Sequence, residues 1–125
     1  MLILTLLALL AQQDVPEQDY GRSEMISTGA SPLHSESWIT DHDYPAEIRR
    51  KLGRRSVKVA LAVGEQGQVG GCKVARSSGS RWLDRETCRL LLKRAEFTPA
   101  ITPMGNLATE FRMIIHWPPK PGEPE

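Results

Sequence analysis

Apolar and polar residues alternate along three stretches of the chain, which is the pattern of strands that bury one face. The three stretches are Val57–Val63, Val69–Arg76 and Ala108–Trp117. Gly64–Gly67, between the first two, has the composition of a turn, so we expect a β-hairpin. Val69 and Cys72 are out of phase with each other, and a β-bulge at Gly70-Gly71 would absorb the extra residue.

Two further stretches carry apolar residues at helical spacing. In the first, Asp43 can act as the cap and Pro45 suits the first helical position. Ile48 and Leu52 share its apolar face, and Gly53 ends the helix.

The second helix runs from Leu83 to Ala95, with Ser80 as its cap and Phe97-Thr98-Pro99 as its stop. Its apolar face is expected to hold Cys88, Leu91, Leu92 and Ala95. The order helix–strand–strand–helix–strand predicts an α+β two-layer sandwich, in which two helices cover one face of a three-stranded antiparallel sheet.

Cys72 and Cys88 are the only cysteines, and both fall on the inward phase of their predicted elements. A strand cysteine and a helix cysteine that face one small core are placed to meet. We therefore expect a structural disulfide and an oxidising compartment. Closing a loop of this length is worth roughly 3 kcal/mol in the chain-entropy model.

The ends of the chain differ in composition from its centre. Residues 1–13 begin with about eleven apolar residues, fewer than the roughly 20 that span a bilayer, so we expect a signal-peptide-like leader with Ala11 before the cleavage point. Residues 14–40 predict an acidic flexible linker, 41–117 a folded domain, and 118–125 an extended proline-rich tail.

The net charge of +1 conceals an uneven distribution of charge. Residues 14–43 hold seven acids and one Arg, whereas residues 44–117 hold six acids and fourteen bases. A basic domain that follows an acidic segment ordinarily has a solvated surface and a disordered linker. The same distribution of charge is also consistent with binding to an anionic partner, or with the acidic leader folding back on the domain. The bases at 49–58 have no interleaved aromatic residues, so we expect no nucleic-acid binding.

No arrangement of residues predicts an enzyme, a cofactor or a metal site. His34, His42 and His116 are dispersed, and neighbours such as Asp41 and Asp43 on an extended chain point in different directions. Trp82 and Trp117 are expected to pack at the ends of the core. Trp38 either docks on the domain or contributes to a binding surface.

The ordered set of these segments resembles the C-terminal domain of the TonB family over Tyr44–Trp117. The segments that carry the resemblance are Tyr44-Pro45-Ala46, Val57–Val63 with the turn exit Gly67-Gln68-Val69, Ser77-Ser78-Gly79 followed by Leu83-Asp84, Phe97-Thr98-Pro99-Ala100, Gly105 and the closing apolar strand. Trp38, the Asp43-Tyr44-Pro45 lead-in and the cysteine pair resemble a subgroup of short, cysteine-paired members.

The resemblance implies that the domain binds a partner in the periplasm and catalyses no reaction. In the family, a short extended peptide of an outer-membrane transporter is added as a strand to the edge of the sheet. The matching positions here are Thr109, Glu110, Phe111, Arg112, Met113, Ile114, Ile115 and His116. Asp41 stands where the family has a Gln that helps to hold the peptide, and a carboxylate cannot donate as that amide does.

The family also implies inner-membrane proton-driven motor proteins as partners, and homodimers formed by strand exchange. An alternative of another class is a soluble envelope scaffold of the same fold. Such a scaffold would pair its sheet edge with itself or with another protein and would transduce no energy.

Overall fold

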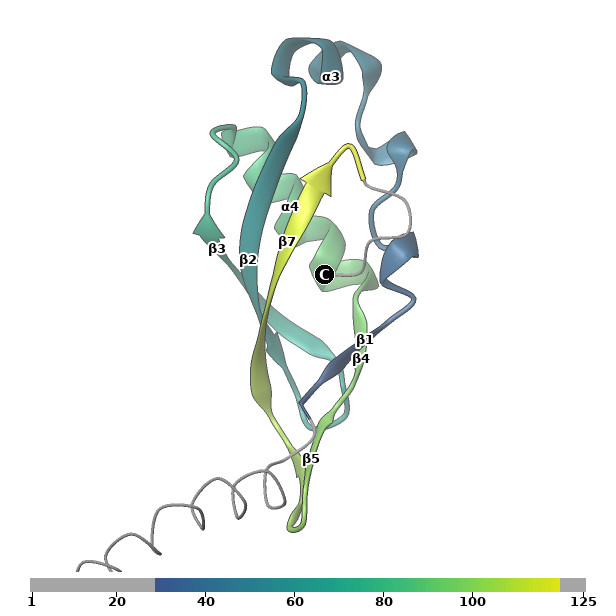
Figure 1. The fold of residues 1–125 in the computed structure, drawn as a ribbon, viewed down its shortest axis with the longest axis vertical. Helices are drawn as coiled ribbons and strands as arrows, with labels where there is room; N and C mark the ends of the chain where they lie inside the picture. Colours follow the sequence, from purple (N-terminus) through teal and green to yellow (C-terminus); the bar gives the residue numbers. More distant parts are fainter. Residues whose placement is uncertain (1–28, 120–125) are drawn as a thin grey trace, which may run out of the picture.

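The centre of the structure is a three-stranded antiparallel sheet in the order β3-β2-β7 (Figure 1). The structure is a computed structural model that describes residues 29–119. The strands are β2 (Arg55–Val63), β3 (Val69–Arg76) and β7 (Thr109–Trp117). Each strand that the alternating pattern predicted is present, and the predicted bulge is confirmed. The register between β2 and β3 shifts between Ala62 and Val63, where Gly70 is the extra residue.

Helix α4 (Arg81–Arg94) lies across one face of this sheet (Figure 1). The Ser80 hydroxyl caps it by accepting a hydrogen bond from Leu83 N–H at 3.2 Å, as predicted. Its buried residues are Leu83, Thr87, Leu90 and Leu91. The expectation that Leu92 faces the core was wrong, since Leu92 is 46% exposed. The α+β fold class itself is confirmed.

The short helix α3 (Ala46–Leu52) stands at one end of the molecule (Figure 1). It buries no residue completely, although Ile48 and Leu52 pack against the core. Pro45 occupies its N-cap position, and Gly53 ends the helix as predicted. Asp43 is not the cap of this helix, because it closes the preceding 3-10 turn η2 (Asp41–Asp43).

The residues that precede α3 form an arm that packs on the domain. Its first element, β1 (Ser31–Leu33), pairs with β4 (Glu96–Thr98), and the 3-10 turn η1 (Ser35–Ser37) follows. Ala30, Trp38, Ile39 and Tyr44 are buried. The expectation of a flexible linker is therefore wrong for residues 30–40, and of the two alternatives for Trp38, docking is confirmed. The predicted leader (1–13), the remaining linker residues 14–28 and the tail residues 120–125 lie outside the described residues.

A second β-hairpin, which the sequence did not predict, extends from the end of the molecule opposite α3 (Figure 1). It consists of β5 (Ala100–Thr102) and β6 (Gly105–Leu107). Its apolar side chains are largely exposed, Met104 by 95%. The hairpin is joined to the β2–β3 turn by a hydrogen bond from Asn106 Nδ2 to the Glu65 carbonyl at 3.0 Å.

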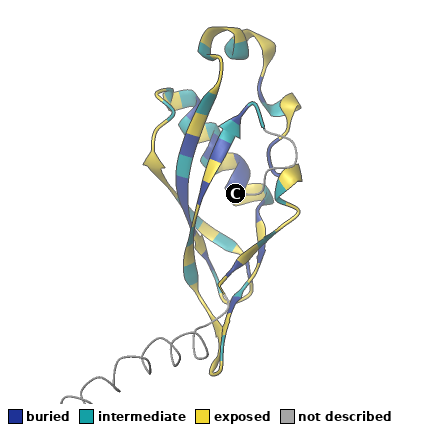
Figure 2. Cartoon of the chain, in the orientation of Figure 1, coloured by how far each residue is buried: buried dark blue, intermediate teal, exposed yellow. Residues whose placement is uncertain are grey.

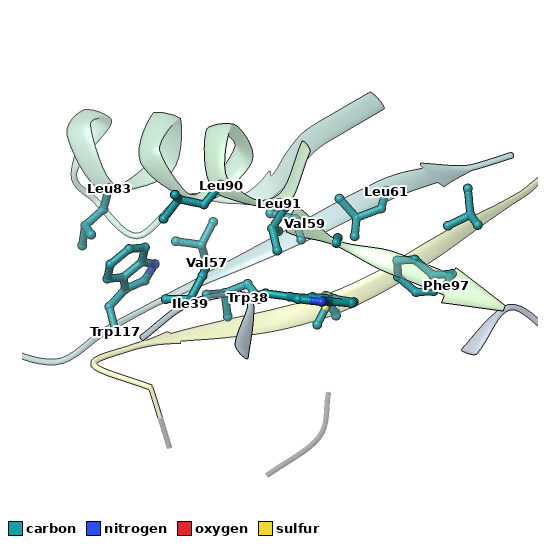
Figure 3. Packing of buried hydrophobic residues seen from close by; sticks show 14 of the residues in the cluster. Trp38, Ile39, Val57, Val59, Leu61, Leu83, Leu90, Leu91, Phe97 and Trp117 are labelled. Carbon is teal, nitrogen blue, oxygen red and sulfur yellow. The ribbon is translucent and has the colours of Figure 1, made fainter. Parts of the chain in front are cut away.

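The core lies between α4, the inner face of the sheet and the arm (Figure 2). Side chains of α4 meet the inward valines and leucine of β2 there, with Trp38 and Phe97 beside them (Figure 3). Trp117 is fully buried, and its Nε1–H donates to Thr87 Oγ1 at 2.9 Å. The Thr87 hydroxyl in turn donates to the Leu83 carbonyl at 2.7 Å, so both polar groups are satisfied inside the core.

The β2–β3 turn is fixed to β4 at a point where only glycine fits. Phe97 N–H donates to the Gly67 carbonyl at 3.1 Å. Gly67 has a φ of +86°, and a Cβ atom there would lie 1.9 Å from the Phe97 carbonyl oxygen. This close approach holds the strand connections together at the end of the sheet where β7 begins.

Candidate functional site

Strand β7 forms one edge of the sheet, and β2 is its only strand neighbour within residues 29–119. The pairing of β7 with β2 runs without any shift from Thr109 opposite Val63 to Trp117 opposite Arg55. A regular strand edge of this length presents a row of backbone donors and acceptors to which another strand can pair.

The hydrogen-bond pattern shows which groups of β7 point toward this edge. Gly64 N–H donates to the Gln68 carbonyl at 2.8 Å, toward β3, so the Val63 carbonyl on the same trans peptide points toward β7. Backbone groups alternate in direction along an antiparallel pair. Counting from the Val63 pair, the N–H and C=O groups of Arg112 and Ile114 therefore point away from β2, toward the open edge.

The side chains of β7 alternate between the two faces of the sheet, as predicted. Met113, Ile115 and Trp117 are buried in the core. Phe111 is half-buried and lies against Phe97, with 4.9 Å between ring centroids. On the outer face, Ile114 is 37% exposed.

The outer face of the sheet is hollowed beside the start of β7. A depression of about 410 Å³ has a floor of small residues and one charged residue on each side, Lys73 of β3 and Glu110 of β7. Its lining residues are Ala60, Ala62, Gly71, Cys72, Lys73, Ala108, Thr109 and Glu110. Glu110 also pairs with Arg112 at 3.1 Å across the exposed surface. This depression was not predictable from the sequence, because residues from three separate segments of the chain form it.

The opposite edge of the sheet, strand β3, is irregular. Two register shifts leave Gly70 and Ala75 as extra residues opposite β2. Bulges of this kind twist an edge and disrupt the ladder that a new strand would extend. The sheet therefore offers one regular edge, that of β7.

A disulfide joins Cys72 of β3 to Cys88 of α4, with 5.6 Å between the Cα atoms, and confirms the predicted bond. Both cysteines pack against the core, as expected from their inward phase, and each is half-buried at its margin. The bond fixes the irregular edge to the helix layer and leaves β7 unconstrained.

The segment before α3 lies beside the far end of β7, because the Tyr44 ring contacts the Trp117 ring at 5.3 Å. Arg94 fastens this segment by donating to both carboxylate oxygens of Asp43, at 2.8 and 3.2 Å, and to the Trp38 carbonyl at 2.8 Å. Burial alone would raise the pKa of Asp43. The hydrogen bonds from Arg94 and from Thr40 N–H, with the Arg94 charge, outweigh burial and hold that pKa below its ordinary value.

Asp41 does not belong to β7. Its carboxylate is largely exposed and accepts a hydrogen bond from Arg49 Nη2 at 3.3 Å. Asp41 lies three residues before Tyr44 in the chain. It therefore belongs to the segment that lies beside the Trp117 end of β7.

Within residues 29–119 there is no cluster of His, Cys, Asp and Glu able to hold a metal ion. No helix in that range is long and apolar enough to cross a membrane.

A family model described as "Gram-negative bacterial TonB protein C-terminal" matches residues 41–118 of the chain. No curated protein and no solved structure matches. The matched region begins at η2 and includes α3, the whole three-stranded sheet and α4, but not the part of the arm before Asp41, which carries Trp38.

Proposed function

Because this chain belongs to the TonB C-terminal family, which is associated with energy-coupled transport in the Gram-negative envelope, we propose that β7 captures an extended peptide of an outer-membrane transporter by strand addition. The proposed location is the periplasm, and the proposed activity is binding without catalysis. The observation that carries the proposal is the regular outer edge of β7, to which no strand within residues 29–119 is added.

An added strand would be held mainly by backbone hydrogen bonds to Arg112 and Ile114, whose N–H and C=O groups point outward. On the core side, its side chains would lie next to Met113 and Ile115, so we expect apolar residues there. On the outer face of the sheet, the side chains of the added strand would meet the exposed Arg112 and Ile114. The depression beside Glu110 on that face offers room for one larger side chain.

Two proline variants test this proposal with a matched control. Ile114→Pro removes an outward donor from β7, and Val74→Pro removes an outward donor from the β3 edge. The two side chains are 37% and 38% exposed, so neither substitution removes a fully buried side chain. Each purified chain would be immobilised and incubated with detergent-solubilised outer-membrane proteins, and captured transporters would be identified by mass spectrometry.

We expect the wild-type chain and Val74→Pro to retain the same transporter and Ile114→Pro to lose it, while all three remain folded by circular dichroism. Capture by Ile114→Pro at the wild-type level would show that β7 is not the docking edge. If the wild-type chain captures no transporter and instead dimerises in an Ile114→Pro-sensitive way, the same edge serves self-assembly and the scaffold alternative is correct.

A further inference from the structure

Positive charge gathers at the end of the molecule where α3 stands. Residues 45–58 and 74–85 together carry nine Lys or Arg and two carboxylates, Glu47 and Asp84. Asp84 accepts hydrogen bonds from Ser77 and Ser78 and pairs with no base of this group. Arg49 is paired with Asp41, which lies outside the two ranges, and the group still carries a large excess of positive charge, which we call the cationic pole.

The fold brings these two sequence ranges together. The β2–β3 register places Lys58 opposite Arg76. Arg55 Nη1 donates to the Ser78 carbonyl at 2.9 Å, and Arg55 Nε donates to the Leu52 carbonyl at 2.9 Å. Arg55 thus fastens the end of α3 to the loop before α4, and both basic ranges belong to one surface.

Most bases of the cationic pole are exposed, and several have no ion-pair or hydrogen-bond partner within residues 29–119. These are Arg50, Lys51, Arg54, Arg76, Arg81 and Arg85. Unpaired bases on one surface produce a positive field that attracts an anionic surface.

The opposite end of the molecule has a different character. Residues 98–109, which include the β5–β6 hairpin, contain no charged residue. The charged residues around them include Glu65, Glu96 and Glu110, with Lys73 as the base that lines the same depression as Glu110. Since α3 and this hairpin lie at opposite ends of the longest axis (Figure 1), the charge is polarised along the length of the domain.

We propose that the cationic pole docks this domain on a membrane surface of anionic phospholipid headgroups. The bases are spread over the exposed ends of α3, β3 and α4, and the depression described above lies elsewhere, on the outer sheet face. A spread of charge over an exposed surface suits a planar layer of phosphates. Single-stranded nucleic acid would need aromatic stacking platforms, and Trp82, the one aromatic residue in the two ranges, packs against the core.

Docking through this pole would stand the long axis of the domain up from the membrane. β7 runs from the hairpin end to the α3 end, so its open edge would stay accessible at the side. Membrane docking is therefore compatible with strand addition but independent of it, and either can fail without the other.

The test measures partition of the full chain onto vesicles of phosphatidylcholine containing roughly 30 mol% phosphatidylglycerol, against pure phosphatidylcholine vesicles. The pure vesicles report any binding through the apolar N-terminal residues, so the ratio of the two partition coefficients isolates the charge effect. The variant is Arg50→Gln/Lys51→Gln, and the control is Arg89→Gln/Lys93→Gln, which makes the same charge change on α4. Near a membrane surface each base favours binding about fivefold, so we expect the variant to lower the ratio roughly thirtyfold and the control to lower it much less.

We expect the wild-type preference for anionic vesicles to vanish when salt is raised from about 20 mM to about 300 mM. A wild-type chain with no preference at low salt would overturn the proposal, and so would equal losses in the variant and the control. Tighter binding to a DNA fragment than to anionic vesicles at equal phosphate concentration would also overturn it and assign the pole to nucleic acid.

Discussion

Replacing Trp38 with alanine tests whether the N-terminal arm is part of the folded domain. Trp38 is 3% exposed, its ring centroid lies 5.4 Å from that of Phe97, and its carbonyl accepts a hydrogen bond from Arg94. Removing a buried tryptophan side chain costs about 3–5 kcal/mol. Domains of this size have total stabilities of roughly 5–10 kcal/mol, so Trp38→Ala should lose about half.

The assay is urea unfolding followed by far-UV circular dichroism, which does not depend on the tryptophan that is removed. Leu33→Ala is the control in the same arm, because Leu33 is 37% exposed and its truncation should cost less than about 1 kcal/mol. If Trp38→Ala lost no more stability than Leu33→Ala, the arm would contribute nothing to folding and the domain would begin near residue 41.

Two further predictions concern buried or partly buried polar contacts. Thr87→Val leaves Trp117 Nε1–H in the core without an acceptor and should lower the free energy of unfolding by about 1–3 kcal/mol in the same urea assay; a variant as stable as wild type would contradict this. The pKa of Asp43 lies below its ordinary 3.8, so its contribution to stability is complete above that value and is lost as the pH falls through the lower folded-state pKa. Asp43→Asn should therefore be less stable than wild type at about pH 7 and closer to it at about pH 3, and an unchanged difference between the two pH values would refute the contribution of this carboxylate.

The sequence predicted the parts of the fold that repeat a local pattern. The alternation along Val57–Val63 defines β2 because every second residue is in contact with the core. The Ser80 cap was recognisable because capping depends only on residues within one turn. The strand β7 was also predictable, because alternation followed by two prolines marks both a strand and its end, whereas its place at the edge of the sheet was expected only from the family resemblance.

The parts that the sequence did not predict depend on contacts between distant residues. Trp38 lies in a polar segment without periodicity, and only its contacts with Phe97 and Arg94 place it in the core. The strands β5 and β6 are three residues each, too short to show alternation. Leu92 and Leu91 are adjacent in the helix and point about 100° apart, so both cannot lie at the centre of one face.

The cationic pole was likewise only partly predictable, because it too depends on contacts between distant residues. The bases of residues 49–58 were visible as one run, whereas those at 76–85 joined them only through the strand register and Arg55. Likewise, the hydrogen bond of Gly64, in the turn that follows β2, determines which backbone groups of β7 point toward the open edge. Local pattern predicts elements, and their register decides which surfaces they form.

Amide hydrogen exchange measured residue by residue by NMR tests strand addition to β7 most directly. In the free chain, the amides of Met113 and Ile115, which pair with β2, should exchange slowly, and those of Arg112 and Ile114 should exchange fast. On addition of a synthetic peptide from the periplasmic segment of a captured transporter, the amides of Arg112 and Ile114 should become slow. Peptide binding that leaves these two amides fast, or that protects Val74 on β3 instead, would contradict the assignment of β7 as the docking edge.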